Sequence, residues 1–191
     1  MGCAHPAGEY TSMAYTIEQS EKMYQGRAFQ VRRDRVRLPD GGLAQLDIVE
    51  HVGAVTIVPV DDEDRVWFVR QYRHATGRDL LELPAGTIEP GEPPEMCAAR
   101  AILDELGMRA GTLRKLGEFF LAPGYSTEYM HVFLATGLVP DPLPGDHDEF
   151  LSVERFPLAE LDRLVQAGEI QDGKTLAGIY LLRLPNAPAK A

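Results

Sequence analysis

The chain has 191 residues, which suits one sizeable domain and is fewer than two independent domains usually need. Its 19 lysines and arginines stand against 29 aspartates and glutamates, so the formal net charge is −10. A chain this acidic repels a phosphate polymer, and we expect no nucleic acid among its partners. Hydrophobic residues at 45% and charged residues at 25% are ordinary globular values, which excludes a disordered or fibrous protein.

The sequence predicts neither a secretion signal nor a membrane span. The N-terminal letters MGCAHPAGEYTS lack the basic start and apolar middle of a secretion signal. No apolar stretch approaches the roughly 20 residues that span a bilayer. We therefore expect a cytoplasmic protein with no membrane partner, in which residues 1–15 form a disordered leader and residues 186–191 a frayed tail.

The first half of the ordered chain has the pattern of strands. Residues 27–38 alternate in polarity and end in the turn 39–42, and residues 43–50 return as the second arm of a hairpin. The apolar runs 53–59 and 65–72 flank the acidic turn 61–64, which predicts a second hairpin. Residues 16–52 are thus expected to form an N-terminal strand region, and residues 53–185 the main domain.

A helix is expected over residues 96–106, because Pro93 and Pro94 favour its start and Gly107 its end. At about 100° per residue, one arc of this helix is predicted to be apolar and the opposite arc polar. The apolar arc holds Met96, Ala99, Ile102, Leu103 and Leu106, and the polar arc holds Arg100, Ala101, Asp104 and Glu105.

The rest of the chain predicts strands at 112–120 and 130–137, which flank the turn-rich letters LAPGYSTE, and a short strand at 153–156. Helical patterns follow at 158–167 and 174–184. Strands at the centre and three helices around them indicate an α/β sandwich around a mixed β-sheet, preceded by the N-terminal antiparallel hairpin region.

Acidic residues gather around the predicted helix. Glu89, Glu92 and Glu95 precede or begin it, and Asp104 and Glu105 end it. Carboxylates so close together repel one another unless a cation or an arginine compensates them. Oxygen-only ligand sets of this kind suit Mg²⁺ or Mn²⁺, which often bridge protein carboxylates to a substrate phosphate.

The glycines, acids and arginine of this stretch carry a resemblance to a known family. Gly86, Glu92, Arg100, Glu105 and Gly107, with the apolar Ile102 and Met108, fall at the spacing of the Nudix box, G-x5-E-x7-R-E-U-x-E-E-x-G-U. Upstream, RQYRHATGRDLLELPAG resembles the segment before the box in ADP-ribose pyrophosphatases, and Pro123, 15 residues after Met108, is similar to the proline of that subfamily. The resemblance covers most of the chain and implies a Nudix-type α/β/α sandwich.

Each residue of the motif has a predicted task. Gly86 and Gly107 are expected to permit backbone turns at its two ends. Arg100 can pair with Asp104 along the helix and with Glu92 across to the loop, which leaves Glu105 to face a metal ion. The resemblance adds the main-chain carbonyl of Ala85 as a further metal ligand.

One position departs from the family pattern. The family has a glutamate after the arginine, whereas this chain has Ala101, four residues before Glu105. The missing carboxylate would be the second arm of the metal site. The polar arc offers the alanine no evident packing role. Either the motif is naturally degenerate or a glutamate was deliberately replaced; we favour the replacement because the rest of the motif is intact. In both cases we expect impaired turnover.

The resemblance implies metal-dependent hydrolysis of a nucleoside diphosphate sugar, with ADP-ribose, cleaved to AMP and ribose 5-phosphate, as first choice. The general base is expected in the acidic loop 146–149, with Glu149 preferred over Asp148 and His147. Glu149 is also a candidate metal ligand.

Four residues are candidate substrate contacts. Arg73 is expected either to bind phosphate or to pair with Asp79 or Glu82. Glu128 is a candidate for positioning metal-bound water or the ribose, and Pro123 and Gly124 complete the set.

The resemblance also implies a homodimer that exchanges the N-terminal hairpin. The alternative function is a catalytically inactive sensor that binds a nucleotide sugar on the same fold.

Overall fold

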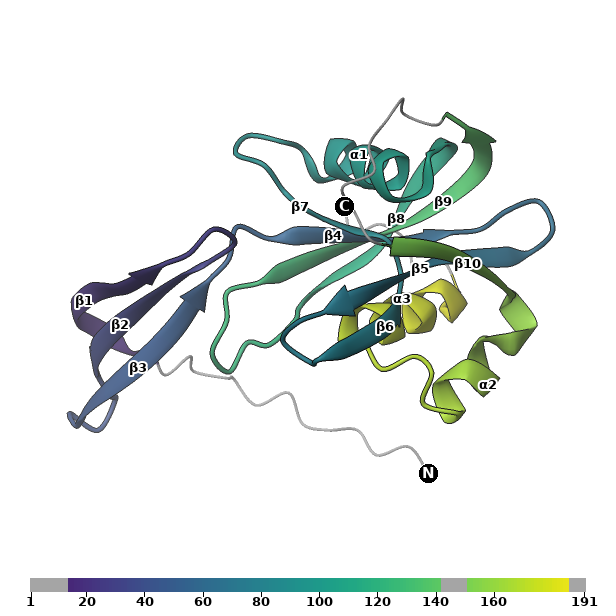
Figure 1. The fold of residues 1–191 in the computed structure, drawn as a ribbon. Helices are drawn as coiled ribbons and strands as arrows, with labels where there is room; N and C mark the ends of the chain where they lie inside the picture. Colours follow the sequence, from purple (N-terminus) through teal and green to yellow (C-terminus); the bar gives the residue numbers. More distant parts are fainter. Residues whose placement is uncertain (1–13, 142–150, 186–191) are drawn as a thin grey trace. The chain divides into compact units, whose positions relative to one another are not determined.

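Ten strands and three α-helices follow one another in the computed structural model, which describes residues 14–141 and 151–185 (Figure 1). The chain divides into two units, one that ends at Glu50 and one that begins at His51. The expected leader and tail lie largely outside the described residues, as does the acidic loop 146–149.

The first unit is a three-stranded antiparallel sheet in the order β1-β2-β3. The predicted hairpin of residues 27–50 is confirmed as β2 (Gln30–Arg37) and β3 (Leu43–Glu50). Its turn is closed by the Gly42 N–H, which donates to Asp40 Oδ1 at 2.8 Å, and Gly41 has a φ of +87°. Strand β1 (Thr16–Gln25) adds a third member on the other side of β2.

The second unit contains a four-stranded mixed sheet in the order β7-β4-β9-β8. Its strands are β4 (Ala54–Pro59), β7 (Ala85–Thr87), β8 (Met108–Phe120) and β9 (Tyr129–Pro140). Strand β4 is parallel to β9, and all six of its residues are buried. A strand buried on both faces reads as a continuous apolar run, as β4 does.

A second sheet in this unit has the order β10-β5-β6, formed by β5 (Arg65–Arg73), β6 (Arg78–Glu82) and β10 (Leu151–Pro157). The predicted hairpin of residues 53–72 is wrong, because β4 and β5 belong to different sheets and share only the bridge between Val60 and Val66. Both edges of β4 are occupied by β7 and β9, so β5 pairs elsewhere.

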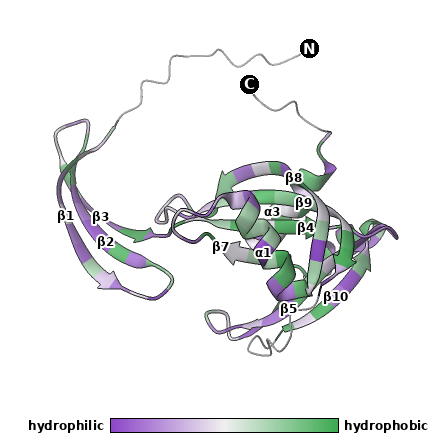
Figure 2. Ribbon diagram, turned by 90° about the horizontal axis from the view of Figure 1, so that it is seen from above, coloured by the Kyte–Doolittle hydropathy of each residue, from purple (hydrophilic) through white to green (hydrophobic). Residues whose placement is uncertain are grey.

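Helices lie on both faces of the mixed sheet (Figure 1). Helix α1 (Pro94–Leu106) covers one face, and α3 (Gly173–Arg183) packs on the other. The short helix α2 (Leu161–Gln166) contributes residues to the same hydrophobic cluster as α3. Hydrophobic residues run along β4 and β9 between these helices (Figure 2). This arrangement confirms the expected α/β/α sandwich.

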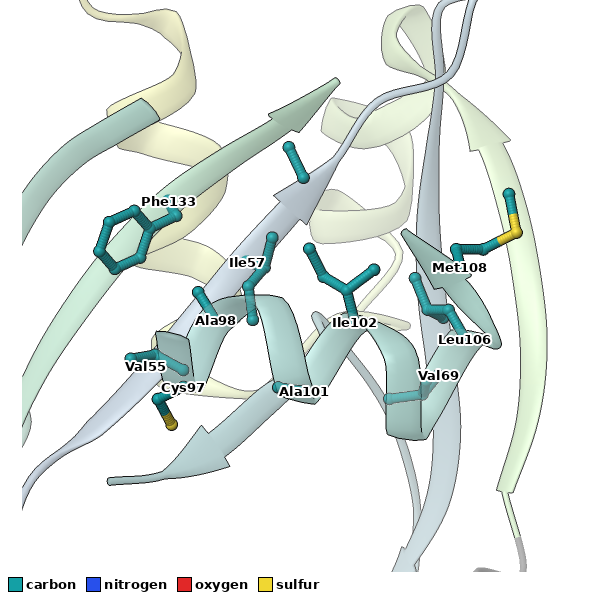
Figure 3. Close-up of a cluster of buried hydrophobic side chains, with 11 residues drawn as sticks. Val55, Ile57, Val69, Cys97, Ala98, Ala101, Ile102, Leu106, Met108 and Phe133 are labelled. Atoms are coloured by element: carbon teal, nitrogen blue, oxygen red, sulfur yellow. The ribbon is translucent and has the colours of Figure 1, made fainter. Parts of the chain in front are cut away.

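The buried face of α1 differs from the predicted one. Its buried residues are Cys97, Ala98, Ala101, Ile102 and Leu106. Ala98 and Ile102 point toward β4, whereas Cys97 and Ala101 face Gly86 on β7 (Figure 3). Met96, assigned to the apolar arc, is 63% exposed. The prediction placed the arc by residue hydrophobicity, whereas the close approach of β7 favours small side chains at positions 97 and 101.

Among the described residues, no helix is both long enough and apolar enough to cross a membrane.

Candidate active site

A bidentate ion pair joins the loop before α1 to the helix, as predicted. Arg100 Nε donates to Glu92 Oε1 at 3.0 Å, and Arg100 Nη2 donates to Glu92 Oε2 at 2.8 Å. Hydrogen bonds from Arg100 and from the Glu89 N–H lower the pKa of Glu92 to about 2, so the pair stays charged at any ordinary pH. Arg100 also lies 3.7 Å from Asp104, which confirms the second predicted pair.

The two motif glycines have different reasons to be glycine. Gly107 ends α1 with a φ of +61°, a conformation that favours glycine, and this confirms the predicted turn. The predicted turn is wrong for Gly86, which lies in β7 without a positive φ, but a side chain there would obstruct the chain, as predicted. A Cβ on Gly86 would lie 3.1 Å from the Cβ of Ala101 and 3.3 Å from the Sγ of Cys97. Gly86 therefore permits close packing between β7 and α1.

Ala101 occupies a packed position in the core beneath α1, where it is only 3% exposed (Figure 3). The prediction that this alanine has no packing role is therefore wrong. The helix turns residue 101 toward Gly86 and Cys97 and away from solvent. The methyl group suits this narrow space, and no carboxylate stands there.

Glu105 and Ala85 meet at the far end of the motif. The half-buried Glu105 accepts a hydrogen bond from the Ala85 N–H on Oε2 at 3.2 Å. The negative charge of Glu105 is also among the causes that raise the pKa of Arg73, after the hydrogen bond and charge of Glu82. The structure thus brings two predicted site residues, Ala85 of β7 and Glu105 of α1, into contact, and places Arg73 of β5 within range of the charge of Glu105.

The oxygen donors at this place suit a hard divalent cation, but they are few. The described residues contain no group of three or more histidine, cysteine, aspartate or glutamate side chains that could hold a metal ion. Glu105 supplies one carboxylate and Ala85 a carbonyl oxygen. The two described donors fit a divalent cation as part of a larger ligand set.

Arg73 forms the ion pair that was one of its two predicted alternatives. Its Nε and Nη2 donate to the two carboxylate oxygens of Glu82, both at 2.7 Å. Glu82 is 1% exposed and also accepts a hydrogen bond from Lys174 Nζ. Lys174 in turn contacts Asp172 Oδ2 at 2.9 Å. We name Arg73, Glu82, Lys174 and Asp172 the Glu82 charge cluster, in which only Glu82 and Lys174 are buried.

The sequence-based predictions named Arg73 and Glu82 of this cluster but missed Lys174 and Asp172. The available signal was Lys174 itself, because a cation in the first turn of a helix faces the positive end of the helix dipole and needs a negative partner. Asp172 supplies one and also caps α3 by accepting from the Thr175 N–H at 3.0 Å.

The other candidate residues lie in two connections. Pro123 and Gly124 are exposed and Glu128 is half-buried in the segment between β8 and β9. That segment is joined to the start of β4, because the His51 N–H donates to Thr127 Oγ1 at 3.0 Å. Glu149, Asp148 and His147 lie outside the described residues, and the next described residue, Leu151, pairs with Gln71 of β5.

Comparisons with known proteins agree with this geometry. A model of the NUDIX domain matches residues 50–178. The ADP-ribose pyrophosphatase of Mycobacterium tuberculosis (strain ATCC 25618 / H37Rv) is 44% identical over 163 residues, which cover 84% of this chain and 79% of that protein. The ADP-ribose pyrophosphatase of Bacillus subtilis (strain 168) is 36% identical over 169 residues, 87% of this chain and 91% of that protein.

A solved structure is similar over most of the same range. The crystal structure of an ADP compounds hydrolase superposes with a TM-score of 0.79 at 29% identity, covering 88% of this chain and 92% of that one. The motif, the fold and these relatives agree, and the chain belongs to the Nudix family as a hydrolase with ADP-ribose pyrophosphatases among its relatives.

Proposed function

We propose that this protein hydrolyses the pyrophosphate bond of a nucleoside diphosphate sugar, with ADP-ribose, cleaved to AMP and ribose 5-phosphate, as its first candidate substrate. The observation that carries the proposal is the contact between Glu105 and Ala85 at the end of the Nudix motif, with Arg73 of β5 within range of the charge of Glu105. A carboxylate for a cation and a guanidinium for a phosphate are the two groups that a pyrophosphate substrate needs. The names of the two bacterial relatives support ADP-ribose.

The metal ion is proposed to be Mg²⁺ or Mn²⁺, held by Glu105, the Ala85 carbonyl and Glu149. Such an ion, when bound, lowers the pKa of a bound water and neutralises phosphate charge. Arg100 and Glu92 fix the loop against the helix that carries Glu105. Ala101 supplies no carboxylate, so metal affinity and turnover are expected to be reduced.

The substrate is proposed to lie between the motif and two flanking connections. Arg73 contacts a phosphate, and Pro123, Gly124 and Glu128 line the sugar or base. Glu149 acts as the general base, with Asp148 and His147 as the other candidates in the loop. The first described residue after this loop, Leu151, pairs with Gln71, two residues before Arg73 on β5, and this supports a role for the loop in the same site.

A homodimer is proposed because the first unit leaves many apolar side chains exposed in the single chain. Ile17 is 55% exposed and Leu46 36% exposed. Their cross-strand partners, Val36 and Asp34, are two residues apart on β2, so both side chains lie on one face of the sheet. Exposed apolar side chains that share one face of a sheet are often covered by a partner, here proposed to be a second copy of the chain.

The second candidate function is a sensor that binds a nucleotide sugar without cleaving it. The burial of Ala101 favours it, since position 101 is part of the core and offers a metal ion no ligand.

The experiment that separates the two candidates compares the protein with its Ala101→Glu and Ala101→Gln variants. AMP release is followed over a panel of nucleoside diphosphate sugars with Mg²⁺ or Mn²⁺, and binding is followed by calorimetry. For an enzyme, Ala101→Glu raises the rate at least about tenfold and Ala101→Gln does not, because only glutamate adds a metal ligand. Tight binding with no cleavage by any variant identifies the sensor, and neither binding nor cleavage rejects both candidates.

A further inference from the structure

Lys174 is a buried lysine in the first turn of α3, a place where a lysine is costly. It is 8% exposed, and the helix dipole disfavours a positive charge at this end of the helix. Burying an ammonium group without partners is also strongly unfavourable. The ammonium contacts Glu82 and Asp172, so two carboxylates offset the cost.

The carboxylate of Glu82 is shared by two cations from different elements. Arg73 on β5 binds both of its oxygens, and Lys174 on α3 binds Oε2. Burial alone would raise the pKa of Glu82, but the hydrogen bonds and charges of Arg73 and Lys174 outweigh it and lower the pKa. Glu82 is therefore held in its charged form between Arg73 and Lys174.

The charge balance beside the proposed phosphate contact depends on Lys174. Arg73 and Lys174 carry two positive charges, against three negative charges on Glu82, Asp172 and Glu105. Without Lys174, Arg73 alone would face all three carboxylates, two of which, Asp172 and Glu105, already act on it through charge. The three carboxylates would then attract the Arg73 guanidinium more strongly, and its positive charge would be less available to a substrate phosphate.

The same turn of α3 also holds the chain segment that leads to Ala85. Thr175 Oγ1 accepts a hydrogen bond from the buried Leu83 N–H at 2.9 Å and donates to Asp172 Oδ2 at 2.6 Å. Leu83 follows Glu82 directly and stands two residues before Ala85. The first turn of α3 is thus connected to both Arg73 and the segment that carries a candidate metal ligand.

We propose that Lys174 is a positioning residue of the candidate active site. It shares the buried carboxylate of Glu82 with Arg73, and thereby holds the Arg73 guanidinium in place with its charge available to a substrate phosphate. The inference rests on the proposed function for its substrate, but the placement of Arg73 itself is measurable without any ligand.

The test compares Lys174→Met, which removes the charge, with Lys174→Arg, which keeps it. Phe156→Leu is the control for lost stability, because Phe156 packs on Phe68 and pairs with Val66 at the other end of β5. The first readout is the Nε–H resonance of Arg73 in a ¹H–¹⁵N NMR spectrum, which reports its bond to Glu82. The second is ADP-ribose affinity by calorimetry in EDTA, where metal-dependent hydrolysis is suppressed. Lys174→Gln replaces the methionine variant if the latter does not fold.

We expect the Arg73 resonance to shift in Lys174→Met and to stay in place in Lys174→Arg and Phe156→Leu. The dissociation constant for ADP-ribose should rise about five- to tenfold in Lys174→Met only. An unchanged Arg73 resonance in Lys174→Met, or an equal loss of affinity in Phe156→Leu, overturns the proposal. A shifted resonance in a protein that binds no ADP-ribose upholds the placement of Arg73 by Lys174 and counts against the proposed substrate.

Discussion

Gly86 on β7 and Ala101 on α1 lie in direct contact, so that a Cβ on residue 86 would stand 3.1 Å from the Cβ of Ala101. Strand and helix can approach this closely because one residue has no side chain and the other only a methyl group. The sulfur of Cys97 closes the same space from the preceding turn of the helix. Any enlargement at position 86 or 101 must therefore move β7 or α1.

Gly86→Ala is expected to lower the free energy of unfolding by about 1–3 kcal/mol, because the added methyl group overpacks the contact with Ala101 and Cys97. Urea unfolding followed by fluorescence measures the change. Gly124→Ala is the matched control, since a Cβ at Gly124 would have no atom within 4 Å and should leave stability within about 0.5 kcal/mol. Equal stabilities of the two variants would contradict the close contact.

Ala101→Glu is expected to unfold at a lower temperature than the unchanged protein when no metal is present, because it buries a charged group in the core. Mg²⁺ should restore part of the loss, since a ligand that binds only the folded state stabilises it. Ala101→Gln should suffer a similar loss without the recovery. Thermal unfolding with and without Mg²⁺ measures both effects, and equal responses of the two variants to Mg²⁺ would count against metal binding at position 101.

The features that the sequence predicted well are governed by residues close together in the chain. The hairpin of β2 and β3 follows from its turn at Asp40 and Gly41, and the end of α1 from Gly107. The Glu92–Arg100 pair was predictable because both residues belong to one spaced motif. These elements depend on turn chemistry and caps, which act over a few residues.

The features that the sequence could not predict depend on partners far along the chain. Strand β4 pairs with β7 and β9 and not with the next strand, a choice that an apolar run does not encode. Lys174 and Glu82 are 92 residues apart and meet only in the folded chain. The buried face of α1 was misassigned because β7 admits only small side chains at Ala101 and its neighbours.

Asp61 is expected to stabilise the turn between β4 and β5 at neutral pH and to lose this effect in acid. Burial alone would raise its pKa, but hydrogen bonds from Trp67 Nε1 and from the backbone and side chain of Arg65 lower it to about 2. Because the pKa of Asp61 is lower in the folded protein than its unfolded value near 4, the charge of Asp61 stabilises the folded state fully above about pH 4. This stabilisation disappears as the pH falls toward 2.

Asp61→Asn should therefore cost about 1–2 kcal/mol at pH 7 and much less at pH 2.5. Urea unfolding at pH 7, 4 and 2.5 measures the difference. Asp62→Asn, in the exposed part of the same turn, is the control and should change stability little at any of these pH values. A pH-independent cost for Asp61→Asn would show that the charge of Asp61 is not the cause.

Cys97 is expected to be inert toward thiol reagents in the folded protein. Its side chain is buried, and burial raises the pKa of the thiol to about 12, so almost no thiolate is present at neutral pH. In a Cys3→Ser background, which leaves Cys97 as the single cysteine, a thiol-specific chromogenic reagent should react only after unfolding. Rapid reaction of the native protein would contradict the packing of α1 on β7.

A double substitution, Ile17→Glu with Leu46→Glu, is expected to convert the proposed dimer to a monomer, because it replaces two exposed apolar side chains on one face of the β1–β3 sheet by charges. Light scattering coupled to gel filtration measures the mass. Leu43→Glu is the control: Leu43 is 48% exposed and pairs with Arg37, on the opposite face. A monomeric unchanged protein, or a dimer of the double variant, would contradict this interface.

Strand β5 belongs to both hydrophobic cores of the second unit. Val69 packs in the cluster beneath α1, whereas Val66 and Phe68 pack in the cluster around α2 and α3. Exposing either cluster to water would displace β5, and with β5 the residues that it contributes to the other cluster. Amide hydrogens of the residues from His51 onward that lie in the two clusters should therefore exchange with solvent through a single shared opening, so that this part of the chain behaves as one folding unit.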